Sequence, residues 1–339
     1  LLRDTAKKGK RELITIMRAF MKNLVYKIYI QILFPVSKKP VEYISTFFAL
    51  IGGYFTLCEI EQAVFKTQML LNIFRNCTLI VPMISAMLVL LLRKESAEKT
   101  AYLGTKDTMI SLKMADLLNI KGSAIVIPTN TTFDTIMSGD FISEKSIQGQ
   151  FQKKMYGVDF STLDMSIKNS LDECYPNCYE ILEDRTKTNR NRYEIGTVAK
   201  ITCNGQHYYF LAVADVSKTG KTQNVTMQNM TKALVGLWEY LSKEGHTEPI
   251  TIPVIGTGRA GLCDGTFEDV VHETIFSFAI KSQDEFVSRK MTICIYPPAL
   301  SDANVTWEKL CGYLELQCQF FAENEKRIKS SRIIGSPVN

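Results

Sequence analysis

Two apolar stretches stand out in the first third of the chain. Residues 41–60 and 74–92 consist almost entirely of apolar and aromatic side chains, with charged residues only near their edges. Their uncharged cores, 43–58 and 77–92, are slightly shorter than the roughly 17–25 residues of a typical membrane-spanning helix. Together they predict a transmembrane hairpin at residues 41–94, and a soluble all-α domain is the alternative.

Positive charge flanks this expected hairpin. Lys38 and Lys39 precede the first apolar stretch and Arg93 and Lys94 follow the second, whereas the connecting segment carries balanced charge. Positively charged flanks remain in the cytoplasm, so both ends of the hairpin are expected there. The pattern therefore predicts a multi-pass membrane protein with a cytoplasmic domain.

The N-terminal segment, residues 1–40, is basic and amphipathic. Between residues 10 and 34, an apolar stripe recurs at helical spacing among lysines and arginines. This pattern is typical of a helix that lies on a membrane surface. A helix that faces a partner subunit shows the same pattern, and both interpretations stay open.

The pattern changes after residue 94. A charged linker is expected at residues 95–108, and residues 109–300 then alternate short apolar runs with amphipathic ones. The expected strands are 122–130, 195–203, 207–216, 291–296 and the one leading into Gly256, and the expected helices are 146–156, 161–174, 228–244, 266–280 and 307–321. Asn204-Gly205 predicts a hairpin turn. The fold class is therefore α/β, a mixed sheet between helices, and residues 301–339 form a C-terminal helix and tail.

One strand of this domain runs into a glycine-rich loop. Residues 251–262 read Thr-Ile-Pro-Val-Ile-Gly-Thr-Gly-Arg-Ala-Gly-Leu, with glycines at 256, 258 and 261. Glycine lets backbone N–H groups turn toward one point, and the positive end of the next helix is expected nearby. The loop therefore predicts a phosphate site, with a simple tight turn as the alternative.

A second strand ends in polar residues. The expected strand 122–130 ends at Asn130, and Thr131, Thr132, Phe133 and Asp134 follow it. Ligands of open α/β sheets bind at the carboxyl ends of the strands. Two such junctions predict a cleft for a phosphorylated nucleotide.

Composition argues against two classes of partner, nucleic acids and metal ions. The chain has 339 residues and a net charge of +5, and its basic excess is concentrated in the N-terminal segment. A nucleic-acid partner is therefore not expected. The nine cysteines include no Cys-x-x-Cys pair and there are only three histidines, which argues for reduced thiols and against a metal site. We expect no bound cofactor.

Four motifs add a resemblance to a known family. They are Ala115-Asp116, Ile127-Pro128-Thr129-Asn130, Phe133-Asp134-Thr135 and Ile147-Gln148-Gly149-Gln150-Phe151. With these motifs and the glycine loop, residues 109–300 resemble a macro domain. Together with the apolar stretches upstream, they resemble the macro-domain effectors of the type II Thoeris anti-phage defence system.

This resemblance implies a receptor rather than an enzyme. In that family, a TIR-domain enzyme consumes NAD and makes an ADP-ribose-derived messenger, which is histidine-ADP-ribose in the type II form. The macro domain binds the messenger, the effector forms a homo-oligomer, and damage to the bacterial inner membrane causes abortive infection. The expected partners are therefore the messenger, the TIR-domain enzyme as its source, further copies of the chain and the lipid bilayer.

The resemblance also implies roles for particular residues. Asp116 is expected at the adenine amino group, Asn130 at the distal ribose, and Tyr296 against the adenosine. Phe133, Asp134 and Gln150 are expected beside Asn130. The backbone expected around the diphosphate is that of Gly256, Thr257, Gly258, Arg259, Ala260 and Gly261. Helix capping by Asp116 and a plain core role for Phe133 are the alternatives.

One departure bears on catalysis. The ADP-ribosyl hydrolases of the macro family carry three successive glycines after the asparagine, whereas residues 131–135 here read Thr-Thr-Phe-Asp-Thr. Hydrolysis is therefore not expected. A membrane-anchored ADP-ribosyl hydrolase with Asp134 as its base is the alternative, and a constitutive channel with a regulatory domain is a weaker third reading.

Overall fold

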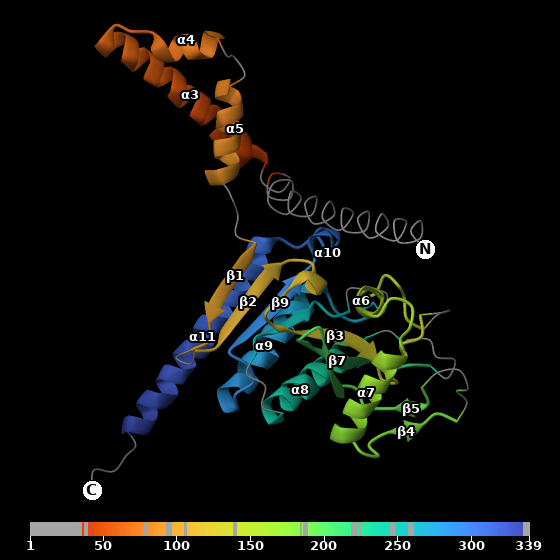
Figure 1. Cartoon of the computed structure of the whole chain (residues 1–339). Helices are drawn as coiled ribbons and strands as arrows, with labels where there is room; N and C mark the ends of the chain where they lie inside the picture. Colours follow the sequence, from red (N-terminus) through yellow and green to blue (C-terminus); the bar gives the residue numbers. More distant parts are fainter. Residues whose placement is uncertain are drawn as a thin grey trace, which may run out of the picture. The chain divides into compact units, whose positions relative to one another are not determined.

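The chain forms two compact units, residues Leu1–Ala97 and Glu98–Asn339 (Figure 1). A computed structural model describes residues 36, 40–76, 80–92, 97–104, 107–137, 141–183, 185, 189–217, 223, 225–244, 248–256 and 261–334. The predicted amphipathic helix at residues 10–34 lies outside the described residues. The two units are described separately below.

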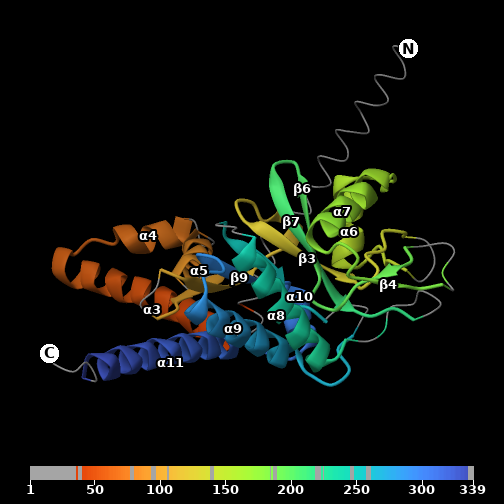
Figure 2. The same ribbon diagram turned by 90° about the horizontal axis from the view of Figure 1, so that it is seen from below.

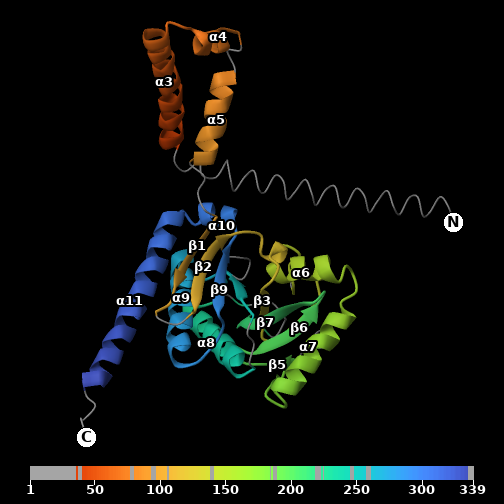
Figure 3. The ribbon, with the colours of Figure 1, turned by 60° about the vertical axis from the view of Figure 1, so that its left-hand side comes forward.

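The first unit contains three helices, α3 (Pro40–Phe65), α4 (Met69–Asn76) and α5 (Ile80–Leu92). α3 contacts both α4 and α5, and Figure 3 shows α3 and α5 side by side. Among the described residues, α3 is the one helix long and apolar enough to cross a membrane. Only Tyr43 and Cys58 of its side chains are buried.

The described residues of the second apolar stretch lie in two helices. Residues 74–76 of the expected span belong to α4, and residues 80–92 form α5, which is shorter than α3. The chain turns after α3 because Lys66 adopts a φ of 53° and the carboxylate of Glu61 accepts hydrogen bonds from the amides of Met69 and Leu70, at 2.8 and 3.0 Å. The carboxylate thus caps the start of α4. A second membrane-spanning helix therefore stays a prediction.

The second unit is built on a seven-stranded sheet of order β1-β2-β9-β8-β3-β7-β6. The strands are β1 (Glu98–Tyr102), β2 (Met109–Met114), β3 (Ala124–Asn130), β6 (Val198–Cys203), β7 (Gln206–Ala214), β8 (Ile250–Pro253) and β9 (Lys290–Ile295). β2, β9, β8, β3 and β7 are mutually parallel, and β1 and β6 close the two edges in antiparallel pairing. β1 lies within the stretch expected to be a linker.

Helices cover both faces of this sheet (Figures 1 and 2). They are α6 (Ile147–Met155), α7 (Ser161–Cys174), α8 (Met227–Lys243), α9 (Phe267–Asp284), α10 (Pro297–Asp302) and α11 (Trp307–Ile334). Phe210 faces Phe151 of α6, whereas its neighbour Tyr209 contacts Tyr240 of α8. Successive strand residues point to opposite faces, so α6 and α8 lie on opposite sides of the sheet. The expected mixed sheet between helices is confirmed.

Local sequence patterns predicted the bounds of several helices to within one residue. α7 has the bounds that the helical spacing predicted, and α6, α8 and the start of α9 differ from the predicted bounds by one residue. The hairpin turn between β6 and β7 has Asn204 and Gly205 at φ 51° and 74°. Both values suit the tight two-residue turn that this dipeptide favours. α11 extends well beyond its expected end, and residues 117–119 form a 3-10 turn.

A glycine in α8 permits its close contact with the turn before β6. A Cβ added to Gly236 would lie 2.5 Å from the carbonyl oxygen of Gly196, whereas a Cβ on Gly312 in α11 would meet nothing within 4 Å. We expect Gly236→Ala to destabilise the fold by about 1–3 kcal/mol because the backbone of the turn must move. Gly312→Ala, the matched control, should stabilise it by about 0.5–1 kcal/mol through higher helix propensity. Urea unfolding of both variants tests this, and equal effects would contradict it.

Candidate functional site

The parallel strands bring several of the predicted site residues to one edge of the sheet. The carboxyl ends of β2, β9, β8, β3 and β7 share this edge because these strands are parallel. Asp116, Tyr296, Gly256, Asn130 and Asp215 lie at or just beyond those five ends, in that spatial order. β8 pairs directly with β3, so the glycine loop and the loop after Asn130 leave neighbouring strands.

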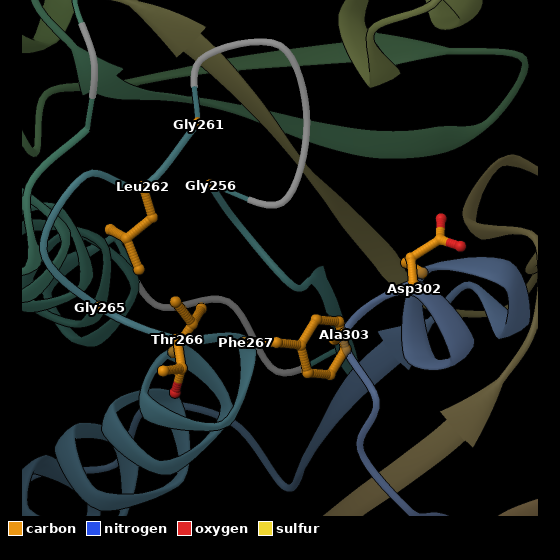
Figure 4. A pocket seen from close by; sticks show the side chains of 10 residues that line it. Gly256, Gly261, Leu262, Gly265, Thr266, Phe267, Asp302 and Ala303 are labelled. Carbon is orange, nitrogen blue, oxygen red and sulfur yellow. The ribbon is translucent and has the colours of Figure 1, made fainter.

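A pocket of about 320 Å³ opens beside the glycine loop (Figure 4). Its lining comes from the two ends of the loop, the first turn of α9, and α10. The lining residues are Gly256, Gly261, Leu262, Gly265, Thr266, Phe267, Val270, Ala299, Asp302 and Ala303. Thr257, Gly258, Arg259 and Ala260 lie outside the described residues.

The two ends of the glycine loop are held together at its base. The amide of Leu262 donates to the carbonyl of Gly256 at 3.0 Å, and Gly256 has a φ of 79°, which favours glycine. Leu262 also pairs with Val225 in an isolated parallel bridge. The loop therefore starts and ends at one point above β8.

The start of α9 supplies the positive end of a helix to this pocket. Thr266 caps α9 in a reciprocal capping box with Asp269, and its hydrogen bonds lower the pKa of the Asp269 carboxyl. The box uses the amides of Thr266 and Asp269, and those of Phe267 and Glu268 lie between them. Unpaired first-turn amides and the helix dipole make such a position favourable for an anion. The pocket thus combines an apolar wall with the N-terminus of a helix.

Asn130 uses its side chain to fix the loop that follows it. Its Oδ1 accepts hydrogen bonds from the amides of Thr132 and Asp134, both at 3.2 Å, and its Nδ2 donates to the Asp134 carboxylate at 3.1 Å. Asn130 is buried. In this arrangement it shapes the turn through local hydrogen bonds, which is a common role of asparagine.

Phe133 lies in the hydrophobic core, which was its alternative interpretation. Its φ is 50°, and its buried ring packs edge-on against Tyr193 with centroids 5.7 Å apart. Positive φ is unusual for a bulky residue, so the surrounding contacts must hold it. The ring belongs to the cluster of apolar side chains under α6 and α7.

Asp134 takes part in a buried ion pair that the sequence did not reveal. Its Oδ2 accepts from the guanidinium of Arg185 at 3.0 Å and from the hydroxyl of Thr132 at 2.6 Å, and both charged side chains are at most 2% exposed. Arg185 lies 51 residues away in a polar loop, and no local sequence pattern predicts its contact with Asp134. Burial raises the pKa of nearby Asp164, and the negative charge of Asp134 raises it further. Asp134 therefore helps to hold the loop after Asn130 in place through Arg185 and Thr132.

Gln150 lies on the exposed side of α6, and its expected contact with the ligand stays a prediction. Gln150 is exposed and donates to the carbonyl of Lys145 at 2.9 Å, at the start of its own helix. Gln148 and Gln152 instead reach the loop, donating to the carbonyls of Asp134 and Thr135 at 2.7 and 2.6 Å. Residues two apart lie on opposite sides of a helix, whereas residues four apart share a face.

Asp116 and Tyr296 lie at the other side of the edge. Asp116 caps the 3-10 turn, accepting from the Leu118 amide at 3.2 Å and from Asn119 Nδ2 at 3.0 Å. Tyr296 follows β9 and is 54% exposed. Asp116 thus has the capping role that was its alternative interpretation, while its partly exposed carboxylate remains at the shared edge.

These features define an α/β domain with a pocket at the carboxyl edge of its sheet. Residues 110–296, more than half of the chain, match the family described as Thoeris protein ThsA, Macro domain. The chain belongs to this family, which confirms the expected macro-domain fold.

Individual relatives are more distant. The Thoeris protein ThsA of Bacillus amyloliquefaciens (strain Y2) is 21% identical over 195 residues, which cover 55% of this chain and 62% of that protein. The match therefore spans less than two thirds of this relative. The Oceanobacillus iheyensis macrodomain with ADP is 9% identical and covers 68% of this chain and 100% of its own, with a TM-score of 0.43. The Trypanosoma brucei macrodomain in complex with ADP-ribose is 11% identical and covers 62% and 72%, with a TM-score of 0.38.

Proposed function

We propose that this chain is a membrane-anchored anti-phage effector whose macro domain binds an ADP-ribose-derived messenger such as histidine-ADP-ribose. The observation that carries the proposal is the pocket between the glycine loop and the first turn of α9. Backbone amides and a helix N-terminus at one point suit a diphosphate, and the adjoining apolar wall suits the rest of a nucleotide. Membership of the ThsA macro-domain family supports the Thoeris assignment.

The messenger would come from a TIR-domain enzyme that consumes NAD. Its binding would favour a homo-oligomer that damages the inner membrane and leads to abortive infection. Ligand drives such a change only if it binds the assembled state more tightly than the free chain. The proposal therefore requires ligand affinity to rise with protein concentration.

The main test is titration of the purified chain with ADP-ribose, histidine-ADP-ribose and NAD. Calorimetry, the mass of the recovered ligand and the size of the protein would be followed together. We expect binding of the ADP-ribose compounds, unchanged ligand mass and larger assemblies. Absence of binding would overturn the proposal, and conversion of the ligand would favour the ADP-ribosyl hydrolase instead.

The buried ion pair weighs against hydrolysis at Asp134. The carboxylate is held by Arg185, Asn130 and Thr132, and its side chain has no solvent exposure. A general base must reach the proton that it removes, directly or through one water. Asp134 meets this requirement only if the loop rearranges.

The membrane role yields a separate prediction. Leu88 lies in α5, and an arginine there would cost about 2.5–3.5 kcal/mol at the centre of a membrane helix. We expect Leu88→Arg to abolish toxicity in cells while ligand affinity stays unchanged, and Leu88→Met to behave as wild type. A toxic Leu88→Arg variant would tell against membrane insertion of α5.

A further inference from the structure

The last helix, α11, carries a row of exposed residues along its outer side. α11 packs against α9 and β1, beside which it lies in Figure 3. Its inner face is formed by the buried residues Trp307, Leu310, Leu314, Cys318 and Phe321. Residues three or four positions apart share one side of a helix, and five exposed residues follow this spacing on the opposite side. We call them the α11 stripe: Lys309, Gly312, Leu316, Phe320 and Glu323.

The middle of the α11 stripe is apolar and continues onto α9. Leu316 is 62% exposed and Phe320 is 53% exposed. The ring of Phe320 lies 5.6 Å from that of Phe321, which lies 6.0 Å from the ring of Phe276 in α9. Phe276 and Ile280, one turn apart on α9, are 41% and 42% exposed. A contiguous apolar patch of this kind, with polar residues at its rim, marks an interaction site.

The order of residues in the α11 stripe is symmetric about Leu316. Gly312 and Phe320 lie four positions on either side of it, and Lys309 and Glu323 lie seven positions on either side. In an antiparallel pair of two copies centred on Leu316, residues equally far from the centre face each other. Leu316 then meets its own copy, Gly312 faces Phe320, and Lys309 faces Glu323. A two-fold axis makes each of the last two contacts twice.

Both of these paired contacts are complementary. A Cβ built on Gly312 meets nothing within 4 Å, so the ring of Phe320 from a second copy has room against its backbone. Lys309 forms an ion pair with Glu268 of α9 at 2.6 Å, yet its side chain is 61% exposed. Its ammonium has three donors and can therefore reach a second carboxylate. A parallel pair would instead set Lys309 against Lys309 and Glu323 against Glu323, which like charges disfavour.

We propose that the α11 stripe is the surface through which two copies of this chain pair, with their α11 helices antiparallel. The inference deepens the proposed function, which requires copies of the chain to assemble, and it rests on that function for its biological role. The pairing itself needs no ligand, because the described lining of the pocket comes from the glycine loop, the first turn of α9 and α10. The two can therefore be tested separately.

The first test measures the mass of the full chain in detergent by light scattering over a range of protein concentrations, without ligand. We expect the wild type to form pairs, and we expect Leu316→Arg to raise the dissociation constant of the pair at least about tenfold. Two arginines would then face each other at the centre of the interface, and like charges placed together in an interface weaken binding strongly. Val235→Arg is the matched control, since Val235 is an exposed apolar residue of another helix, α8, and is 44% exposed. It should pair as the wild type does.

The second test fixes the direction of the helices by disulfide formation. Lys309 and Glu323 are about 21 Å apart along one helix at 1.5 Å per residue, so cysteines at both positions of one chain cannot join each other. The double variant Lys309→Cys with Glu323→Cys should form covalent dimers under mild oxidation. Each single variant should give no more dimer than the wild type, whose nine cysteines set the background.

Each outcome bears on the pairing alone. A wild-type chain that stays a single copy would overturn it and leave the α11 stripe for a different partner, such as a lipid surface. Leu316→Arg with unchanged pairing, or covalent dimers from the single cysteine variants, would also overturn the antiparallel arrangement. Pairing without any binding of ADP-ribose-type nucleotides would uphold this inference and count against the proposed function.

Discussion

Replacing Leu262 with glutamate is expected to lower the affinity for ADP-ribose-type nucleotides by about 100-fold. Leu262 lines the pocket where the glycine loop returns to its base. A carboxylate there would face the proposed diphosphate. Unit charges about 5 Å apart repel by about 3 kcal/mol at an effective dielectric constant of about 20, which is about 100-fold in affinity. Calorimetric titration with ADP-ribose measures this loss.

A neutral replacement separates charge from shape. Leu262→Gln has nearly the same size as Leu262→Glu and lacks the charge, so we expect it to lose less than about tenfold. The difference between the two variants should shrink at high salt only slightly, because partly buried charges are poorly screened. Equal affinity of both variants would place the diphosphate elsewhere, and equal affinity of Leu262→Glu and wild type would remove the ligand from this pocket.

The sequence predicted the framework of this site because its signals are local. Helical spacing defined α7, the Asn204-Gly205 turn defined the β6–β7 hairpin, and apolar runs defined β3 and β9. Parallel strands put their ends at one edge as a matter of geometry. For this reason, the sequence alone predicted that the glycine loop and the loop after Asn130 lie at the same edge of the sheet.

The contacts within the site could not be predicted because they are not local. The partner of Asp134 comes from a polar loop 51 residues further along the chain. Gln150 was expected where Gln148 and Gln152 lie, because the phase of α6 depends on its packing and on where the helix starts. Likewise, the apolar stretch at 74–92 gave no sign that the carboxylate of Glu61 would cap a separate helix α4.

Replacing Arg185 with leucine is expected to destabilise the macro domain by about 3–5 kcal/mol. The substitution leaves the Asp134 carboxylate buried without a counter-charge, and removal of one partner from a buried pair typically has this effect. A loss of this size is a large fraction of the roughly 5–15 kcal/mol that stabilises a typical domain. Urea unfolding of the full chain, followed by tryptophan fluorescence, measures it, since Trp238 is buried between α8 and α9.

Two further variants show whether the buried charge is the cause. Arg190→Leu removes a neighbouring guanidinium whose partner Glu183 is exposed, so its effect should stay below about 1 kcal/mol. Adding Asp134→Asn to Arg185→Leu removes the unpaired charge while an amide oxygen can still accept from Thr132. The double variant should therefore be more stable than Arg185→Leu alone, because the penalty arises from the isolated carboxylate and not from the loss of packing. If the two losses simply added, Arg185 would act through its packing against the loop and not through the charge of Asp134.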